Sequence, residues 1–357
     1  MKTTNKYYNI EDDLKLYPAA WCYIVLSARG PGKTYSTLKY MIDTNSTFLF
    51  LKRTIEDVNL ICKRASDSTQ SDSDISPFVP INRDHGTNIK PFKISKGFGA
   101  FYNTEIENDK IVPVGDILGW IAAASMTEDI KGFNMLPDFY IFDEFAPKPW
   151  ERIRHTEGQA LLDLYETLSR DRVKRGNPEL KFIALGNTVN INAPLLTALG
   201  LVDDIVSMQL NNEEYKYIDG IMIHILPPAD NIIKGELTGI QKRMLNTKYG
   251  KMAYLGEFGY NDFTCVNRQS LKGYRCIFSF TRENLTYYVY KKDRMYYVCD
   301  SYQKVNLSYN LDIEIECNEF YLTRCFELKN ATIEGRVNYQ SFSAYDLIMN
   351  FKKYYSI

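Results

Sequence analysis

The sequence contains few of the residues that most often bind transition metals. Its 357 residues include seven cysteines and three histidines, and no two cysteines have the C-x-x-C spacing of a metal site. A zinc centre is therefore not expected. The odd number of cysteines also argues against a disulfide framework, so the thiols are interpreted as reduced and mostly buried. The cysteines are Cys22, Cys62, Cys265, Cys276, Cys299, Cys317 and Cys325.

The chain also lacks a strong net charge and long apolar runs. Its formal net charge is −1, so any contact with nucleic acid has to use local lysines and arginines or a ring of subunits. No apolar stretch approaches the length of about eighteen residues that a membrane span requires. The first residues do not resemble a signal peptide either. We therefore expect a cytoplasmic protein with no membrane partner.

The composition that remains is typical of a globular protein with two domains. A chain of 357 residues is longer than one hydrophobic core usually supports. Apolar residues make up 45% and charged residues 24%, which is average for packed proteins. The 27 tyrosines and 19 phenylalanines are dense beyond residue 250. Because aromatic side chains pack well on pleated sheets, they predict a strand-rich C-terminal domain rather than a surface for stacking nucleic-acid bases.

A glycine-rich segment ending in Gly-Lys-Thr lies between an apolar run at residues 23–26 and a potential helix at 35–42. The order strand, glycine-rich turn and helix is that of a phosphate-binding loop, in which backbone N–H groups point at phosphate oxygens. Lys33 is expected to reach the β- and γ-phosphates of ATP, and Thr34 to hold Mg²⁺. Ser27 replaces the usual first glycine. The residues predicted to bind the nucleotide are Ser27, Ala28, Arg29, Gly30, Pro31, Gly32, Lys33 and Thr34.

Two consecutive acids follow a second apolar run at residues 139–142. A buried strand delivers such acids to the carboxyl edge of a sheet, beside the phosphates. Asp143 is predicted to bind Mg²⁺ through water, and Glu144 to act as the general base that polarises the attacking water. The paired acid and the long separation from the glycine-rich loop favour the additional-strand, catalytic-glutamate (ASCE) group of ATPases. Kinases and small GTPases, which lack the pair, are disfavoured.

Further polar residues follow the next predicted strand and helix. Asn187 ends an apolar run at 182–185, where it is either a sensor of the γ-phosphate or an ordinary turn asparagine. Arginine is needed because charge develops on the transferred phosphoryl group. Arg29 is the candidate within the same subunit, whereas Arg170 and Arg172 are candidates that act on a neighbouring subunit. The alternative for the last two is a basic helix end stabilised by the helix dipole.

Apolar strands alternate with helices through the first half of the chain, which predicts an α/β domain with a largely parallel sheet. Segments around 92–95, 100–103 and 118–124 are interpreted as β-hairpins inserted in it. We expect an ATPase domain at 1–202, a lid or linker at 203–261, and a smaller α+β domain at 262–357. A helix is predicted over 151–175.

The order of these pieces resembles one family, the genome-packaging ATPases of phi-twenty-nine-like podophages. The likeness spans most of the chain, although only the two nucleotide-binding motifs are specific when each is taken alone. The residues that carry it are Tyr8-Asn9, Ala28-Arg29-Gly30, Gly32-Lys33, Lys52-Arg53, Gly119-Trp120, Phe142-Asp143-Glu144-Phe145, Ser169-Arg170-Asp171-Arg172, Asn187, Phe278-Ser279-Phe280 and the segment 345–353.

The resemblance implies roles for several residues. Arg170 matches the arginine finger that acts on the neighbouring subunit, Arg29 the phosphate-loop arginine of terminase-like motors, and Asn187 the sensor that couples hydrolysis to movement. Lys131 and Lys148 match loops that line the pore and touch DNA. The family further implies a homo-oligomeric ring, a pentamer, that works with double-stranded DNA at the portal of a procapsid in the host cytoplasm. A structural RNA is a further candidate partner.

For residues 262–357 the resemblance implies an RNase H-like fold that is similar to the nuclease domain of large terminases but vestigial. The first predicted strand, 275–280, has no aspartate where such a metal site begins. Asp300, Asp312, Glu314 and Glu316 form no convincing set for two-metal cleavage. The predicted function is ATP-driven DNA translocation into a procapsid. The alternatives are a terminase large subunit with an active nuclease and a static structural adaptor at the portal.

Overall fold

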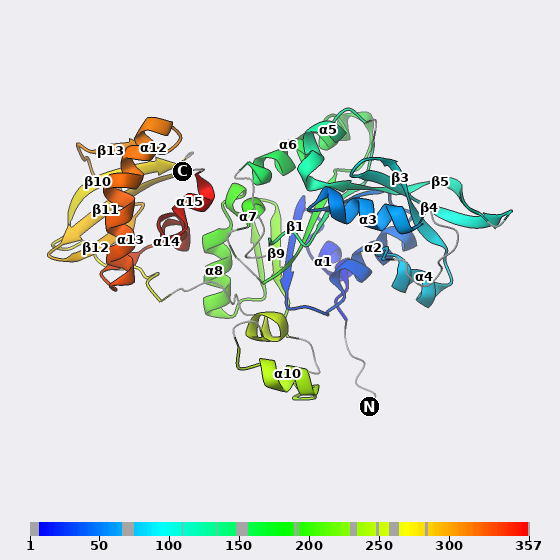
Figure 1. Ribbon diagram of the computed structural model, residues 1–357, viewed down its shortest axis with the longest axis horizontal. Helices are drawn as coiled ribbons and strands as arrows, with labels where there is room; N and C mark the ends of the chain where they lie inside the picture. Colours follow the sequence, from blue (N-terminus) through cyan, green and yellow to red (C-terminus); the bar gives the residue numbers. More distant parts are fainter. Residues whose placement is uncertain are drawn as a thin grey trace. The chain divides into compact units, whose positions relative to one another are not determined.

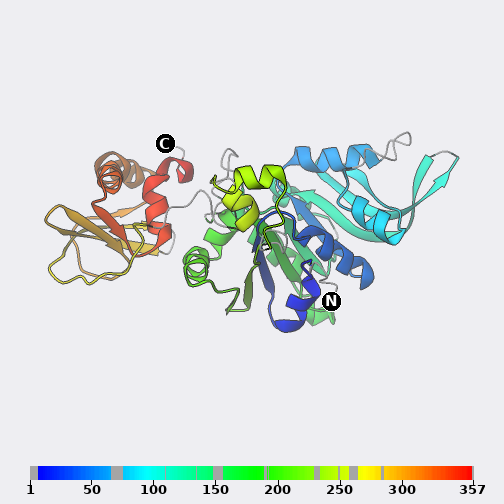
Figure 2. The ribbon, with the colours of Figure 1, turned by 90° about the horizontal axis from the view of Figure 1, so that it is seen from below.

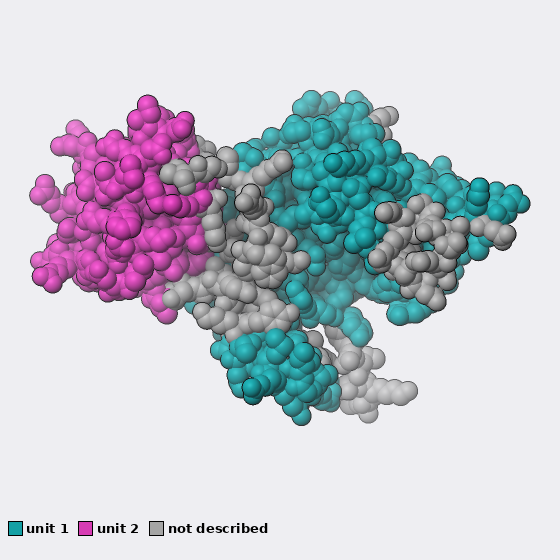
Figure 3. All heavy atoms as spheres, viewed as in Figure 1, with its two compact units in different colours: residues 1–199, 208–260 teal, residues 200–207, 261–357 magenta. Residues whose placement is uncertain are grey.

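The computed structural model describes residues 7–65, 75–108, 110–133, 135–147, 156–188, 191, 193–228, 234–247, 250–256, 264–282 and 285–355. The chain forms two compact units (Figure 3), one built from residues 1–199 and 208–260 and the other from 200–207 and 261–357. We refer to them as unit 1 and unit 2. Within the described residues, no helix is both long and apolar enough to cross a membrane.

Unit 1 is organised around a nine-stranded sheet in the order β3-β4-β5-β2-β6-β7-β1-β9-β8 (Figure 1). The six strands from β5 to β9 in this order pair in parallel, and antiparallel strands complete both edges. The α/β class and the largely parallel sheet are thus confirmed. The strands are β1 (Cys22–Ser27), β2 (Phe48–Lys52), β3 (Ile89–Ser95), β4 (Phe98–Glu107), β5 (Lys110–Ala123), β6 (Phe139–Asp143), β7 (Lys181–Asn187), β8 (Tyr215–Ile218) and β9 (Ile221–Ile225).

Helices cover the sheet because its central strands are apolar on both faces, as parallel strands usually are. Alternate residues of β1 point to opposite faces: Tyr23 and Val25 join the core with Leu38 of α2, while on the other face Tyr140 of β6 contacts Tyr165 of α6. The helices of unit 1 are α1 (Ile10–Leu16), α2 (Lys33–Asp43), α3 (Ile55–Ala65), α4 (Val79–His85), α5 (Thr127–Ile130), α6 (Glu157–Ser169), α7 (Pro194–Ala198) and α10 (Gly239–Met244). Helix α8 (Val202–Asn211) begins among the residues of unit 2 and ends among those of unit 1. Short 3₁₀ segments lie at η1 (Ala124–Met126) and η2 (Val173–Arg175), and a π-helical turn at η3 (Lys251–Leu255).

Strand β7 lies between β1 and β6, so the strand that feeds the glycine-rich loop does not pair directly with the strand that ends in Asp143. The parallel register brings Ser27 opposite Asn187 and Asp143 opposite Leu185. Carboxyl ends of parallel strands meet at one edge of a sheet. The fold therefore gathers the predicted polar residues at a single edge.

Two expectations about unit 1 need correction. The helix predicted over 151–175 is present only as α6 and ends before Arg170, because Asp171 adopts a left-handed φ of 60° that a continuous helix cannot accommodate; residues 151–155 lie outside the described residues. The segment predicted as a lid or linker contains β8 and β9, and β9 pairs in parallel with β1. The many charged residues of this segment led us to overlook a short apolar strand, β9. The inserted hairpins are confirmed as the β3–β4–β5 meander.

Unit 2 is an α+β unit with a five-stranded sheet in the order β13-β10-β11-β12-β14 (Figure 1). Its core is rich in aromatic side chains, including Phe278, Phe280 and Phe320, which confirms the strand-rich interpretation of this region. The strands are β10 (Arg275–Arg282), β11 (Leu285–Lys292), β12 (Met295–Cys299), β13 (Ser308–Asn310) and β14 (Val337–Tyr339). The helices are α12 (Glu314–Phe320), η4 (Tyr321–Cys325), α13 (Phe326–Ile333), α14 (Phe342–Met349) and α15 (Phe351–Tyr354).

Candidate functional site

A cavity of about 550 Å³ opens at the carboxyl edge of the unit 1 sheet. Its size is that of a typical small-molecule site. Residues from three separate sequence regions line it, and every one of them belongs to, or directly adjoins, a motif singled out in the sequence. The lining residues are Arg29, Gly30, Pro31, Gly32, Lys33, Thr34, Tyr35, Asp143, Glu144, Leu185, Gly186 and Asn187.

The glycine-rich loop turns tightly before α2. Gly30 and Gly32 have φ values of 97° and 89°, a left-handed region that residues with side chains rarely adopt. Gly32 is the N-cap of α2, so the helix begins where the loop ends. The first N–H groups of the helix have no hydrogen-bond partner within the helix. Together with the positive end of the helix dipole, these groups make an anion-binding cradle.

Lys33 is buried and its ammonium group is held by three oxygens. Its Nζ donates to Ser27 Oγ, to the Ala28 carbonyl oxygen at 3.4 Å and to Asn187 Oδ1 at 3.3 Å. Ser27, which departs from the usual glycine, thus accepts a bond from the loop lysine. Burial lowers the pKa of Lys33 to about 8, against the opposing effect of the carboxylates of Asp143 and Glu144.

Thr34 and Asp143 meet although they are far apart in the sequence. The Thr34 hydroxyl donates to Asp143 Oδ1 at 2.8 Å, and Asp143 is buried at the end of β6. A hydroxyl and a carboxylate are the hard oxygen donors that Mg²⁺ uses in proteins, where it keeps much of its water shell. The two side chains therefore fit the ion that the motifs imply.

Glu144 has a backbone conformation that is rare for a glutamate. Its φ is 55°, in the left-handed region, and its side chain is 59% exposed at the cavity. A residue other than glycine costs free energy when its backbone adopts this left-handed conformation, and such residues concentrate at functional sites. Glu144 thus lines the cavity directly after the end of β6.

Lys52 is a member of this site to which the sequence analysis gave no role. It ends β2, and its Nζ lies 2.8 Å from Asp143 Oδ2 and 3.7 Å from Glu144 Oε2. Burial alone lowers the pKa of Lys52, but the two carboxylates outweigh it and raise that pKa above the ordinary value. The sequence signals were a basic residue at the end of an apolar run and its place among the residues that carry the family resemblance.

Asn187 and Arg29 both line the cavity. Asn187 ends β7 and accepts from Lys33, so it contacts the phosphate loop from the inserted strand. Arg29 has an exposed side chain, and its backbone N–H donates to the Ala253 carbonyl oxygen at 3.1 Å. The turn η3, from the segment predicted as a lid, therefore contacts the start of the loop.

The candidates for action between subunits and for DNA contact are not at this cavity. Arg170 is the exposed C-cap residue of α6. Arg172 is buried and donates to the Pro178 and Pro137 carbonyl oxygens and to Asp138, so it has a structural role. Lys131 follows α5 and pairs with Glu128 at 2.8 Å. Lys148 lies outside the described residues.

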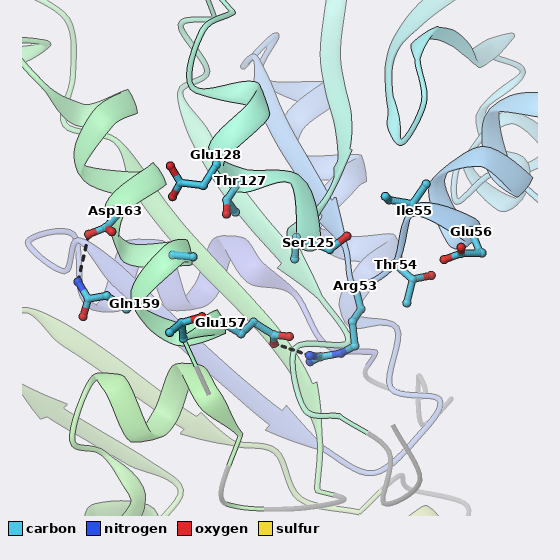
Figure 4. A pocket seen from close by; sticks show the side chains of 13 residues that line it. Arg53, Thr54, Ile55, Glu56, Ser125, Thr127, Glu128, Glu157, Gln159 and Asp163 are labelled. Carbon is cyan, nitrogen blue, oxygen red and sulfur yellow. Dashed lines mark hydrogen bonds and ion pairs between the residues drawn. The ribbon is translucent and has the colours of Figure 1, made fainter. Parts of the chain in front are cut away.

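A second cavity, of about 590 Å³, lies beside α6 (Figure 4). One of its lining residues is Arg53, which directly follows Lys52. The Arg53 guanidinium forms an ion pair with Glu157, at the start of α6, and donates to the Phe145 carbonyl oxygen, just after Glu144. Arg53 thus connects the turn of Glu144 with the helix that ends at Arg170.

The acids of unit 2 form no comparable site. Among the residues described, no group of three or more histidines, cysteines, aspartates or glutamates could hold a metal ion. Glu316 accepts from the backbone N–H of Asn310, and Asp300 follows the end of β12.

Unit 1 has the fold of the ASCE class of P-loop ATPases. A strand inserted between the phosphate-loop strand and the acid-ending strand, with Lys33, Thr34 and Asp143 gathered at one edge, defines that class. The sequence model of the family "Podovirus DNA encapsidation protein (Gp16)" matches residues 106–322, more than half of the chain. The chain therefore belongs to the podovirus DNA encapsidation protein family.

Two solved structures resemble the whole chain. A chain of the bacteriophage Phi-29 viral genome packaging motor assembly has a TM-score of 0.63 and 20% identity, with 98% of this chain and 99% of that chain covered. The Phi-28 gp11 DNA packaging motor has a TM-score of 0.62 and 15% identity, with 99% of each chain covered. At these identities the likeness demonstrates a shared fold. No curated protein sequence matches the chain.

Proposed function

We propose that this protein is the ATP-hydrolysing subunit of a viral DNA packaging motor, which drives double-stranded DNA into a procapsid. The observation that carries the proposal is the meeting of Thr34 and Asp143 beside the buried Lys33, in a cavity of nucleotide size. Membership of the DNA encapsidation family and a fold shared with a packaging motor support the choice of DNA packaging over other uses of ATP.

Each polar residue of the cavity has a role in ATP hydrolysis. Lys33 binds the β- and γ-phosphates, and the loop N–H groups bind the remaining phosphate oxygens. Thr34 and Asp143 hold Mg²⁺, which neutralises charge on the phosphates when it is bound. Glu144 orients the attacking water and accepts its proton. Asn187, in contact with Lys33, responds to the presence of the γ-phosphate, and Arg29 binds the nucleotide from the rim of the loop.

The assembly is a homo-oligomeric ring, a pentamer, attached to the portal of a procapsid in the host cytoplasm. A ring supplies what the single subunit lacks, because Arg170 is exposed at the end of α6 and does not line its own cavity. Arg170 reaches the nucleotide of the neighbouring subunit as an arginine finger. Lys131 and Lys148 contact DNA in the pore, and a structural RNA joins the motor to the portal. Unit 2 is a vestigial nuclease-like unit that does not cut DNA.

Replacement of the general base tests the catalytic part of this proposal. Glu144→Gln keeps the size of the side chain but removes its basicity, so turnover should fall about 10²- to 10⁴-fold while ATP binding persists. Glu105→Gln, on an exposed position of β4, is the matched control and should behave as wild type. Normal hydrolysis by Glu144→Gln would reject the assignment of the base.

A protection assay tests the motor function itself. Purified protein is incubated with procapsids, ATP and linear double-stranded DNA, and nuclease is then added. We expect full-length DNA to survive only when wild-type protein and ATP are both present. ATP hydrolysis that neither responds to DNA nor protects it would favour the static adaptor instead.

A further inference from the structure

The N-terminal arm, residues 7–16, lies against the phosphate loop and α2 (Figures 1 and 2). Tyr8 donates its backbone N–H to the Pro31 carbonyl oxygen at 3.0 Å, in the middle of the loop. Ile10 donates its backbone N–H to Ser36 Oγ at 2.9 Å, one turn into α2. The arm thus holds the loop and the start of its helix from outside the cavity.

A buried polar network ties the arm to the sheet. The Tyr8 hydroxyl donates to Asp13 Oδ2 at 2.7 Å, and His224 Nδ1 lies 2.9 Å from the same oxygen. Asp13 and His224 are 1% and 4% exposed. On its other side, His224 Nε2 lies 3.3 Å from Glu214 Oε1, and the Tyr215 ring stacks on the imidazole at 4.0 Å between centroids.

These partners hold the network in one arrangement. A buried carboxylate is costly unless hydrogen-bond donors satisfy it, and Asp13 obtains two donors, from Tyr8 and from His224. Burial, followed by the charge of Asp13, raises the pKa of Tyr8 well above its ordinary value, so the hydroxyl remains a donor. Without Tyr8, the buried Asp13 carboxyl group would keep its contact with His224 but lose the hydroxyl donor.

The network also includes a residue of the strand that pairs with β1, the strand that leads into the loop. His224 belongs to β9 and pairs with Val25 of β1, two residues before the loop begins. The loop is therefore held on two sides: by β1 through the chain itself, and by the arm, which is anchored on the neighbouring strand β9. The function of ATP hydrolysis does not by itself require such a second anchor.

We infer that Tyr8, Asp13 and His224 are positioning residues that hold the phosphate loop in its nucleotide-binding shape, by anchoring the N-terminal arm on β9. This inference rests on the proposed function, since it assigns the loop a nucleotide. None of the three side chains lines the cavity, so they act through the arm and not on the nucleotide. Their loss should weaken ATP binding more than it slows the chemical step.

The test compares two tyrosines that differ in their acceptor. Tyr8→Phe removes the bond to Asp13. Tyr23→Phe removes a similar bond from Tyr23 to the Tyr17 carbonyl oxygen, at the end of the same helix α1, without touching Asp13. We expect Tyr8→Phe to raise the Kd of Mg-ATP roughly tenfold, as loss of a hydrogen bond to a charged group does, with kcat within about twofold of wild type. Tyr23→Phe should leave Kd unchanged.

A double variant supplies a second readout. If Tyr8 and His224 act through one carboxylate, Tyr8→Phe combined with His224→Gln should weaken binding no more than the stronger single variant. Thermal unfolding is followed in parallel to identify variants that fail to fold. Wild-type binding by Tyr8→Phe, equal weakening by Tyr23→Phe, or fully additive effects would each overturn the inference. Failure of the wild-type protein to bind Mg-ATP would instead reject the proposed function, and the inference with it.

Discussion

The two sheets of this protein hold charged residues in different ways. In unit 1, the ends of β1, β2, β6 and β7 bring Lys33, Lys52, Asp143 and Asn187 into contact at one edge. In unit 2, the central strands β10, β11 and β12 run antiparallel, and among the described residues no group of three or more acids, histidines or cysteines could hold a metal ion. The second sheet instead packs aromatic rings into its core.

The difference follows from the residues that end and follow the strands. Parallel strands all end at the same edge, so one polar residue after each strand is enough to build a site there. Among the described strands of unit 2, β11 alone runs against its neighbours, since β13 pairs in parallel with β10 and β14 with β12. The residues that follow these strands in the sequence, however, include no glycine-rich loop ending in Gly-Lys-Thr. We therefore place the chemistry in unit 1 and expect the acids of unit 2 to be dispensable.

The largest effect is expected from Arg170. Arg170→Ala should lower DNA-stimulated ATP hydrolysis about 10³-fold, because an arginine finger stabilises charge in the transition state. Rings that also contain Lys33→Ala subunits should recover part of the activity, since each variant keeps what the other lacks. Arg175→Ala, an exposed neighbour, is the control. Wild-type turnover by Arg170→Ala would show that the site is complete within one subunit.

A comparable loss of ATP hydrolysis, about 10²- to 10³-fold, is expected when the lysine charge next to the phosphates is removed. Lys33→Ala deletes the buried ammonium, and both ATP affinity and turnover should fall because Lys33 interacts with ground state and transition state alike. Lys39→Ala, on the exposed side of the same helix and paired with Asp43, should have no effect. Titration with a fluorescent ATP analogue and a steady-state assay separate the two losses.

Substitution of Lys52 tests whether this lysine contributes to turnover together with the acids beside it. Lys52→Met keeps the length of the side chain but removes the cation beside Asp143 and Glu144, and turnover should fall about tenfold, as for loss of one charge-assisted hydrogen bond. Lys52→Arg should restore part of the rate. If Lys52→Met hydrolyses ATP normally, its contacts in the free protein have no part in turnover.

The smallest effect is expected in unit 2. Asp300→Asn and Glu314→Gln, alone and together, should leave ATP hydrolysis and DNA packaging within about twofold of wild type, as exposed substitutions usually do. Plasmid nicking in the presence of Mg²⁺ or Mn²⁺ is measured alongside. If the wild-type protein nicks the plasmid and these substitutions abolish the nicking, unit 2 has a nuclease activity and the contrast between the two sheets is wrong.

Several features were predictable from the sequence because they depend on residues that are close along the chain. The glycine-rich loop, Lys33 and Thr34 form one continuous motif, and Asp143 with Glu144 directly follows an apolar strand. Lys52 could not be assigned a role in this way, since its position depends on β2 lying beside β6. Arg172 was predicted to act on a neighbouring subunit or to form part of a basic helix end, and only the fold shows it buried against Pro137 and Asp138.

The glycine-rich segment was enough to predict phosphate binding, because a phosphate cradle needs consecutive backbone N–H groups and particular residues within one short turn. The tertiary structure decided which distant residues complete it: Lys52 at Asp143, Asn187 at Lys33, and Asp13 with His224 behind the loop. The physical reason is that strand order and helix packing result from burying many apolar side chains at once. Contacts between remote polar residues are a consequence of that packing, and no local pattern records them.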